Sequence, residues 1–210
     1  MATHLLSGND ESILRSAVHE LVDELVGAGE RAMMVDEFDG DEYELRLVFD
    51  AAQTPSFLTD KRVIVARDVG RFSSDLAPLL AYLADPLESS DLVLVVNGGA
   101  VPKKLGDAVK AVGTVVNTSP PSRPKDRQEW ISEHIASAGL RIKPDAAAQL
   151  GQWLGEDAGR LDGILATLTS TYGSDHVLTF ADVEPFLGEA GGVPPWDFTD
   201  AVDTGNTTKA

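Results

Sequence analysis

The sequence predicts an α/β fold with a five-stranded, mostly parallel sheet, followed by a small all-helical domain. Three observations support this fold class. Strand-like and helix-like segments alternate over the first 120 residues, which favours right-handed crossovers between parallel strands. Residues 62–66 and 91–96 form uninterrupted apolar runs, typical of strands covered on both faces. After the proline-rich residues 119–124, the segments are almost all helix-like.

The predicted elements of the first domain follow from local signals. The first strand, residues 3–7, ends at Gly8, and Asn9 and Asp10 can cap the next helix. Apolar residues then recur at three- and four-residue spacing over residues 13–26, which indicates an amphipathic helix. The other predicted strands are residues 32–38, 62–66, 91–96 and 114–117. The other predicted helices are residues 43–52, 76–84 and 103–111.

Two proline-containing linkers, residues 119–124 and 189–195, divide the chain. We therefore expect an α/β domain at residues 1–120 and a helical domain at residues 125–190. A short extended link at residues 140–142 joins two of its helices. The predicted helices of the second domain are residues 125–138, 144–154, 158–171 and 180–187. The last residues show no helix-ending signal, so we expect residues 191–210 to begin a region that the chain lacks.

Composition and charge exclude several classes of protein. The 210 residues include no cysteine, which excludes a disulfide scaffold, thiol catalysis and cysteine-ligated metal sites. No apolar stretch approaches the roughly 18–20 residues of a membrane span, and the N-terminus lacks the features of a secretory signal. We therefore expect a cytoplasmic protein without membrane contact.

The net charge of −17 is unevenly distributed. Residues 1–50 carry 13 acids and 3 bases, residues 51–143 carry 10 and 12, and residues 144–210 carry 11 and 2. Both acidic ends disfavour tight, autonomous binding to DNA or RNA. The same charge also serves to keep a protein soluble, and the sequence alone leaves that explanation open.

The first strand and helix stand where a phosphate-binding P-loop would lie, but the required residues are missing. The pattern G-x-x-x-x-G-K-[ST] uses backbone amides and a lysine to hold phosphates, and a hydroxyl to bind magnesium. Counting from Gly8, Ile13 replaces the second glycine, Leu14 the lysine and Arg15 the hydroxyl residue. The segment is either a degenerate P-loop or an ordinary strand–turn–helix.

Other catalytic or metal sites find no support in the sequence. Asp68 and Asn97 follow buried strands but are expected to be turn residues. The acidic residues 36–44 do not make an EF-hand, because Val35 and Arg46 would occupy its first and twelfth positions. The histidines lack metal-binding spacing, and no G-x-S-x-G motif of a serine hydrolase occurs. We expect no cofactor and no catalytic residue.

One polar turn contains two large apolar residues just before a buried strand. Phe57 and Leu58 follow Ser56, and Lys61 and Arg62 lead into the strand. A neighbouring apolar pair at a loop tip suits insertion into a hydrophobic pocket of a partner. The alternative is that the pair folds back and fastens the preceding helix to the sheet.

Taken together, these features resemble the delta subunit of bacterial DNA polymerase III, a component of the clamp loader. No single motif carries the resemblance, which rests on the order and spacing of short segments along nearly the whole chain. The segments are Leu5-Leu-Ser-Gly8, Ser56-Phe57-Leu58 with Lys61-Arg62-Val-Ile-Val65, Leu92-Val-Leu-Val95, Trp130-Ile131, Gly155-Glu-Asp157 with Arg160-Leu161, and Phe198-Thr-Asp200.

The resemblance implies an AAA+-like P-loop fold that neither binds nor hydrolyses ATP, and a non-catalytic role in DNA replication. It implies binding to the beta sliding clamp, with Phe57 and Leu58 as a hydrophobic wedge that opens the ring. Ser56 would lie beside the wedge, and Lys61 and Arg62 would meet acidic groups at the rim of the clamp pocket.

The resemblance also implies partners and a missing part. The gamma/tau and delta-prime subunits would be partners of the full-length protein, and DNA would be contacted only within the assembled loader. Residues 191–210 would include the start of a truncated collar domain. The chain as given would then bind the clamp but join the loader poorly.

Three alternatives remain open at this stage. An active P-loop ATPase or nucleotide kinase would need the lysine that Leu14 replaces. The related delta-prime subunit usually has a zinc-binding cysteine module, which this sequence lacks. A regulatory α/β adaptor unconnected with replication is the third.

Overall fold

A computed structural model describes residues 2–98, 100–155 and 157–187. The chain forms two compact units, residues 1–119 and residues 120–210, and each is described here by itself. The expected opening of a collar domain at residues 191–210 lies outside the described residues.

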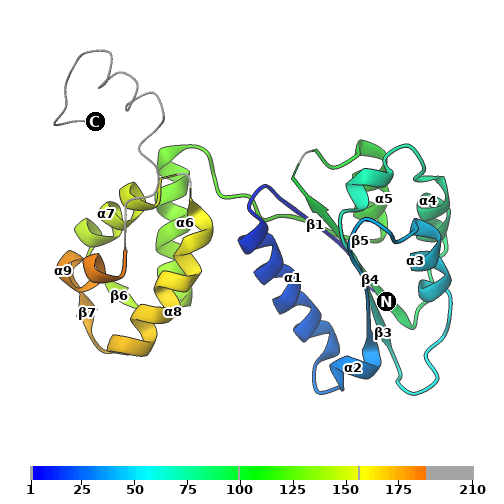
Figure 1. Cartoon of the computed structure of the whole chain (residues 1–210), viewed down its shortest axis with the longest axis horizontal. Helices are drawn as coiled ribbons and strands as arrows, with labels where there is room; N and C mark the ends of the chain where they lie inside the picture. Colours follow the sequence, from blue (N-terminus) through cyan, green and yellow to red (C-terminus); the bar gives the residue numbers. More distant parts are fainter. Residues whose placement is uncertain (1, 99, 156, 188–210) are drawn as a thin grey trace, which may run out of the picture. The chain divides into compact units, whose positions relative to one another are not determined.

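Unit 1 contains a parallel five-stranded sheet in the order β2-β3-β4-β1-β5 (Figure 1). The strands are β1 (Thr3–Gly8), β2 (Val35–Phe38), β3 (Arg62–Ala66), β4 (Ser90–Asn97) and β5 (Gly113–Asn117). The two apolar runs in the sequence are β3 and β4, and both are buried over nearly their whole length. The predicted five-stranded α/β fold is confirmed, and every strand pair in this sheet is parallel.

Helices cover both faces of the sheet. Successive residues of a strand point to opposite sides, so the apolar strands contribute side chains to a core on each face. Helix α1 (Glu11–Val26) packs with Leu6 of β1 on one face. Helices α3 (Leu45–Ala52), α4 (Ala77–Ala84) and α5 (Lys103–Val112) pack with Leu5 on the other face. Figure 1 shows these three helices on the side of the sheet opposite α1. A 3-10 turn, η1 (Val69–Phe72), follows β3.

The strand predicted at residues 32–38 is only partly correct. Its first half belongs to a short helix, α2 (Arg31–Met34), and β2 begins at Val35. The amide of Met34 donates to the carbonyl of Glu30, which closes one helical turn. Alanine and methionine favour helix, and here this local preference prevails over the apolar run.

Unit 2 consists mainly of helices around one apolar core that includes Ile131, Leu150 and Leu168. Its elements are α6 (Pro124–Ser137), α7 (Pro144–Leu154), η2 (Ala158–Arg160), α8 (Leu161–Tyr172), α9 (Phe180–Val183) and η3 (Glu184–Phe186). The extended link predicted at residues 140–142 contains β6 (Arg141–Ile142), but the prediction missed its parallel partner, β7 (Val177–Leu178). Strands of two residues are too short to show an alternating pattern.

In the described part of the chain, no helix combines the length and the apolar character needed to cross a membrane.

Candidate functional site

The first region of interest is the connection from β1 to α1, where a P-loop would lie. Only Asn9 and Asp10 separate the strand from the helix. One carboxylate oxygen of Asp10 accepts hydrogen bonds from the amides of Ser12 (3.0 Å) and Ile13 (3.2 Å). Free amides at a helix N-terminus are the groups that bind phosphate. In this chain a side chain already occupies two of these amides.

The residues at the other P-loop positions also have structural roles. Leu14 is buried between α1 and the sheet, and Ile13 is nearly so. Arg15 lies on the surface and pairs with Glu11 one turn earlier. A Cβ at Gly8 would collide with the hydroxyl of Thr118. Ile13 and Leu14 therefore serve the packing of α1, and Arg15 lies on the surface of the helix.

The carboxyl ends of the strands border a pocket of about 190 Å³ with mixed charges. Arg67 lies in this pocket and pairs with Glu37 (2.6 Å) and Asp39 (3.8 Å). Asp68 is a turn residue, as expected, with a left-handed backbone (φ 53°) at the start of η1. Asn97, expected to be a turn residue, is instead the last residue of β4, and it also lines the pocket. Carboxylates outnumber cations in this lining, so its electrostatics disfavour a polyphosphate.

The acidic segment after β2 is fixed over the same edge of the sheet. The Tyr43 hydroxyl donates to the carbonyl of Arg67, and burial raises the pKa of Tyr43 to about 12. The guanidinium of Arg71 lies over the rings of Tyr43 (4.3 Å) and Phe72 (4.5 Å) and donates to the Gly40 carbonyl (2.6 Å). Among the described residues, no group of three or more His, Asp or Glu side chains is arranged to hold a metal ion.

The Asp10 cap gives a stability prediction. Asp10→Ala should lower the free energy of unfolding by about 1 kcal/mol, because two helix amides lose their acceptor. Asp10→Asn should restore most of that loss, because asparagine caps helices about as well as aspartate. Urea unfolding followed by circular dichroism measures both, and equal stability of wild type and Asp10→Ala would contradict the assignment.

The second region of interest is the loop of residues 53–61, at the opposite end of the sheet between α3 and β3 (Figure 1). Phe57 is fully exposed, at 101%, and Leu58 is 80% exposed. The alternative in which this pair folds back onto the sheet is therefore wrong. Exposure of two adjacent large apolar side chains at one loop tip favours a binding role.

Hydrogen bonds beneath the exposed pair hold the loop in shape. The hydroxyls of Ser56 and Thr59 lie 2.6 Å apart, and the Thr59 amide donates to Ser56 Oγ (3.1 Å). The Thr59 hydroxyl also lies 2.7 Å from the Lys61 carbonyl, to which it donates. Ser56 thus supports the turn that carries Phe57 and Leu58, and it is only partly exposed.

Arg62 and Lys61 anchor the end of the loop to the sheet. Arg62 is largely buried, and its Nε donates to Asp36 of β2 (2.9 Å) while Nη1 donates to the Thr54 carbonyl (3.1 Å). The Lys61 ammonium lies 3.5 Å from Asp91, a carboxylate that is almost fully buried in β4. Lys61 keeps about half of its side chain exposed, whereas Arg62 is turned towards the protein.

Sequence reasoning missed Thr59, Asp36 and Asp91 as supports of this loop. Asp91 gave a signal, because it begins an otherwise apolar strand and a buried carboxylate needs a partner. Asp36 gave none, since its partner Arg62 is remote in sequence and the pairing depends on the neighbouring positions of β2 and β3.

Comparison with known families supplies the decisive observation. The model of the family described as "DNA polymerase III, delta subunit" matches residues 4–117, which is more than half of the chain. The chain belongs to this delta-subunit family. A search of curated proteins finds no significant match.

One solved structure of a delta protein shares the fold of this chain. The Bacillus subtilis DNA clamp loader delta protein matches with a TM-score of 0.71 at 17% identity, over 91% of this chain and 59% of that protein. This chain therefore spans about three fifths of the length of that relative. A DNA polymerase III gamma-subunit-related protein from Thermotoga maritima matches with a TM-score of 0.42 at 19% identity, over 80% of this chain and 57% of that one. The likeness to the Bacillus subtilis delta protein is a likeness of fold.

Proposed function

We propose that this chain is a clamp-loader delta subunit that binds the beta sliding clamp through Phe57 and Leu58 and opens the ring. The observation that carries the proposal is the full exposure of Phe57 on a loop fixed from beneath by Ser56, Thr59 and Arg62. Membership of the delta-subunit family supports the choice of partner. The gamma/tau and delta-prime subunits are the further partners of this function, and DNA contact belongs to the assembled loader.

The energy for ring opening comes from differential binding. Burying a Phe or Leu side chain contributes roughly 2–3 kcal/mol by area. If the loop fits the opened ring better than the closed one, the ring equilibrium shifts by the difference between the two affinities. No covalent step is needed.

We also propose that the chain acts without ATP. Three features support this: the two-residue connection from β1 to α1, the Asp10 carboxylate on the helix amides, and the buried Leu14 at the lysine position. The competing assignment as an active P-loop ATPase requires a lysine at the position of Leu14.

Ring opening can be measured without the rest of the loader. Sliding clamp of the same genome is placed on nicked circular plasmid DNA, and its release is followed by gel filtration after the chain is added without nucleotide. We expect release to accelerate with the concentration of the chain and to be the same with and without ATP and magnesium. No acceleration would contradict the ring-opening role, and release that depends on ATP would contradict the nucleotide-independent mechanism.

A further inference from the structure

Two segments enter the sheet next to each other at the end that carries Phe57 and Leu58. Helix α2 leads into β2, and the loop of residues 53–61 leads into β3. These strands are parallel neighbours, with Val35 opposite Val63, and paired strands lie about 4.8 Å apart. Arg62 ties the loop to β2, the strand into which α2 leads, because its guanidinium bonds both Asp36 of β2 and the carbonyl of Thr54. Figure 1 shows α2 and this loop at the same, lower end of unit 1.

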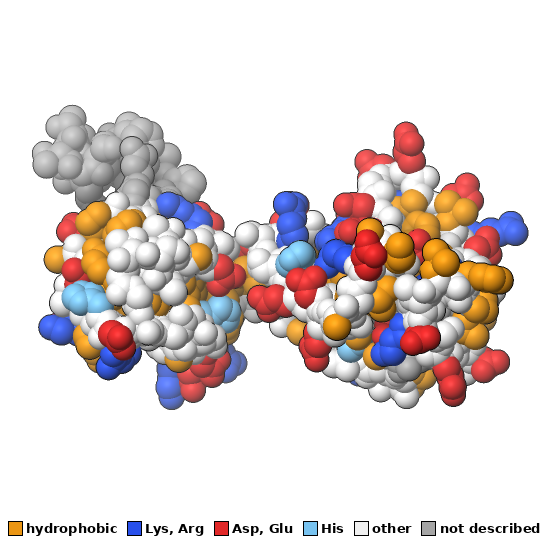
Figure 2. Space-filling model, turned by 90° about the horizontal axis from the view of Figure 1, so that it is seen from below, with side chains coloured by type: hydrophobic (Ala, Val, Ile, Leu, Met, Phe, Trp, Pro, Cys, Tyr) orange, Lys and Arg blue, Asp and Glu red, His pale blue; other side chains and the backbone are white. Residues whose placement is uncertain are grey.

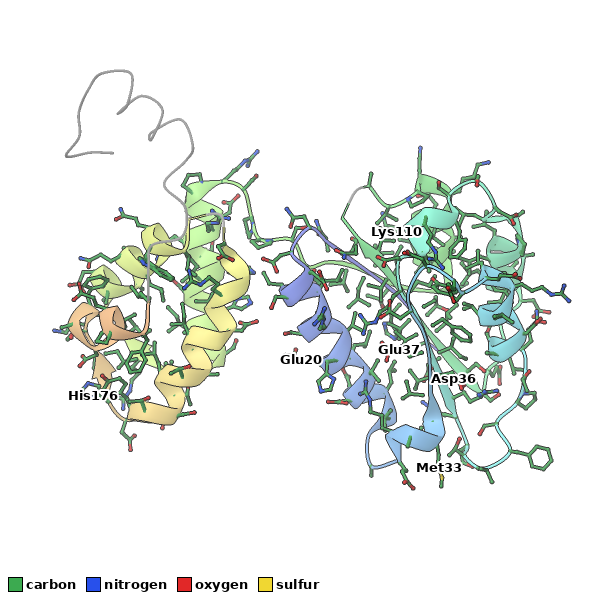
Figure 3. All side chains as sticks on the ribbon, in the orientation of Figure 1. Glu20, Met33, Asp36, Glu37, Lys110 and His176 are labelled. Carbon is green, nitrogen blue, oxygen red and sulfur yellow. The ribbon has the colours of Figure 1, made fainter. Side chains whose placement is uncertain are left out.

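Helix α2 presents its two methionines in opposite ways. Met34 is 8% exposed and serves the fold, whereas Met33 is 55% exposed. Figure 3 shows Met33 at the lower end of unit 1, directed away from the sheet. Figure 2 views the molecule from this end, where hydrophobic side chains of unit 1 lie exposed between charged ones. The helix preference of methionine accounts for α2, and the exposure of Met33 also leaves its side chain available to a partner.

The area that a stable interface needs exceeds what the loop tip supplies. A standard interface buries about 800 Å² on each partner. One aromatic side chain buries about 150–250 Å², so Phe57 and Leu58 together supply well under that area. A partner seated on this pair must also cover a flank of the loop. One flank is α2, where the exposed Met33 follows the exposed Glu30 and the partly exposed Arg31, whose charge is paired with Asp23. The other flank leads into β4 with the exposed Asp85 and Glu88.

The α2 flank is the one whose burial is more favourable, because it offers a large exposed apolar side chain and its arginine is already paired. Removing Met33 from water stabilises a complex, whereas covering Asp85 and Glu88 requires matched cations on the partner. Methionine is also flexible and fits irregular apolar surfaces. We propose that the sliding-clamp surface that receives Phe57 and Leu58 extends over α2, with Met33 as a second apolar contact. This inference rests on the proposed function and adds the direction in which the interface continues.

Binding to immobilised sliding clamp of the same genome, measured by surface plasmon resonance, tests the inference. Met33→Ala should weaken binding about 5-fold, and Met33→Asp at least about 20-fold, because the aspartate would bring an unpaired charge into an apolar contact. Leu47→Ala is the matched control, because Leu47 is 49% exposed and lies in the first turn of α3, at the opposite end from the loop. We expect it to bind within 2-fold of wild type.

The variants distinguish a contact at Met33 from the clamp binding by Phe57 and Leu58 on which it rests. Met33 is exposed, so both substitutions should leave the melting temperature within about 2 °C of wild type. If both Met33 variants bind like wild type while Phe57→Ala/Leu58→Ala does not, α2 lies outside the interface and only the inference fails. If Glu88→Ala weakens binding and Met33→Ala does not, the partner covers the other flank. If the Phe57→Ala/Leu58→Ala protein also binds like wild type, the proposed function fails as well.

Discussion

Replacing both Phe57 and Leu58 with alanine should weaken binding to the sliding clamp by at least about 100-fold. Burial of each side chain contributes roughly 2–3 kcal/mol by area, and 100-fold corresponds to about 2.7 kcal/mol, which allows for incomplete burial. The free energy of unfolding should stay within about 0.5 kcal/mol of wild type, because both side chains are exposed in the free chain. Isothermal titration calorimetry with purified clamp measures the affinity, and urea unfolding measures the stability.

The single variants sharpen this result. Phe57 is the more exposed residue and has the larger apolar area, so Phe57→Ala should account for more of the loss than Leu58→Ala. Leu47→Ala removes another exposed leucine, which lies in α3, and this variant should bind with the affinity of wild type. Equal affinity of the double variant and wild type would remove Phe57 and Leu58 from the interface.

Arg62→Ala should have a large effect of a different kind, lowering both stability and clamp affinity. Its removal leaves the Asp36 carboxylate and the Thr54 carbonyl to water, and the loss of these charged hydrogen bonds costs about 1–2 kcal/mol of unfolding free energy. The loop then samples many conformations, and the apparent affinity falls with the fraction that remains competent. We expect about 10-fold weaker binding, seen mainly as a slower association rate.

Arg62→Lys tests whether Arg62 acts by holding the loop in place or by contacting the clamp directly. Lysine keeps the charge opposite Asp36 but cannot bond Asp36 and Thr54 with one planar group, so both stability and affinity should recover only in part. Asp36→Asn should weaken clamp binding in the same way, although Asp36 lies in β2. If Asp36→Asn and Arg62→Ala lower stability but leave the association rate unchanged, the loop does not depend on this pair.

The parallel sheet could be predicted from the sequence because β3 and β4 are continuous apolar runs, and such runs signal burial on both faces. The sequence prediction was wrong at two places. The apolar residues of helix α2 continue into the strand that follows it, so the pattern predicts a strand throughout, and β7 is too short to show an alternating pattern. The same Phe–Leu pair was compatible with burial or exposure, and only the hydrogen bonds of Ser56 and Thr59 show how an exposed pair is held.

The short connection between β1 and α1 limits how this domain can change. A lysine at position 14 would enter the apolar layer between α1 and the sheet, and it would still find the helix amides occupied by Asp10. A nucleotide site would require a longer connection, a different cap and a repacked layer at the same time. Because each step alone would destabilise the fold or gain nothing, single substitutions would not create a nucleotide site in this domain.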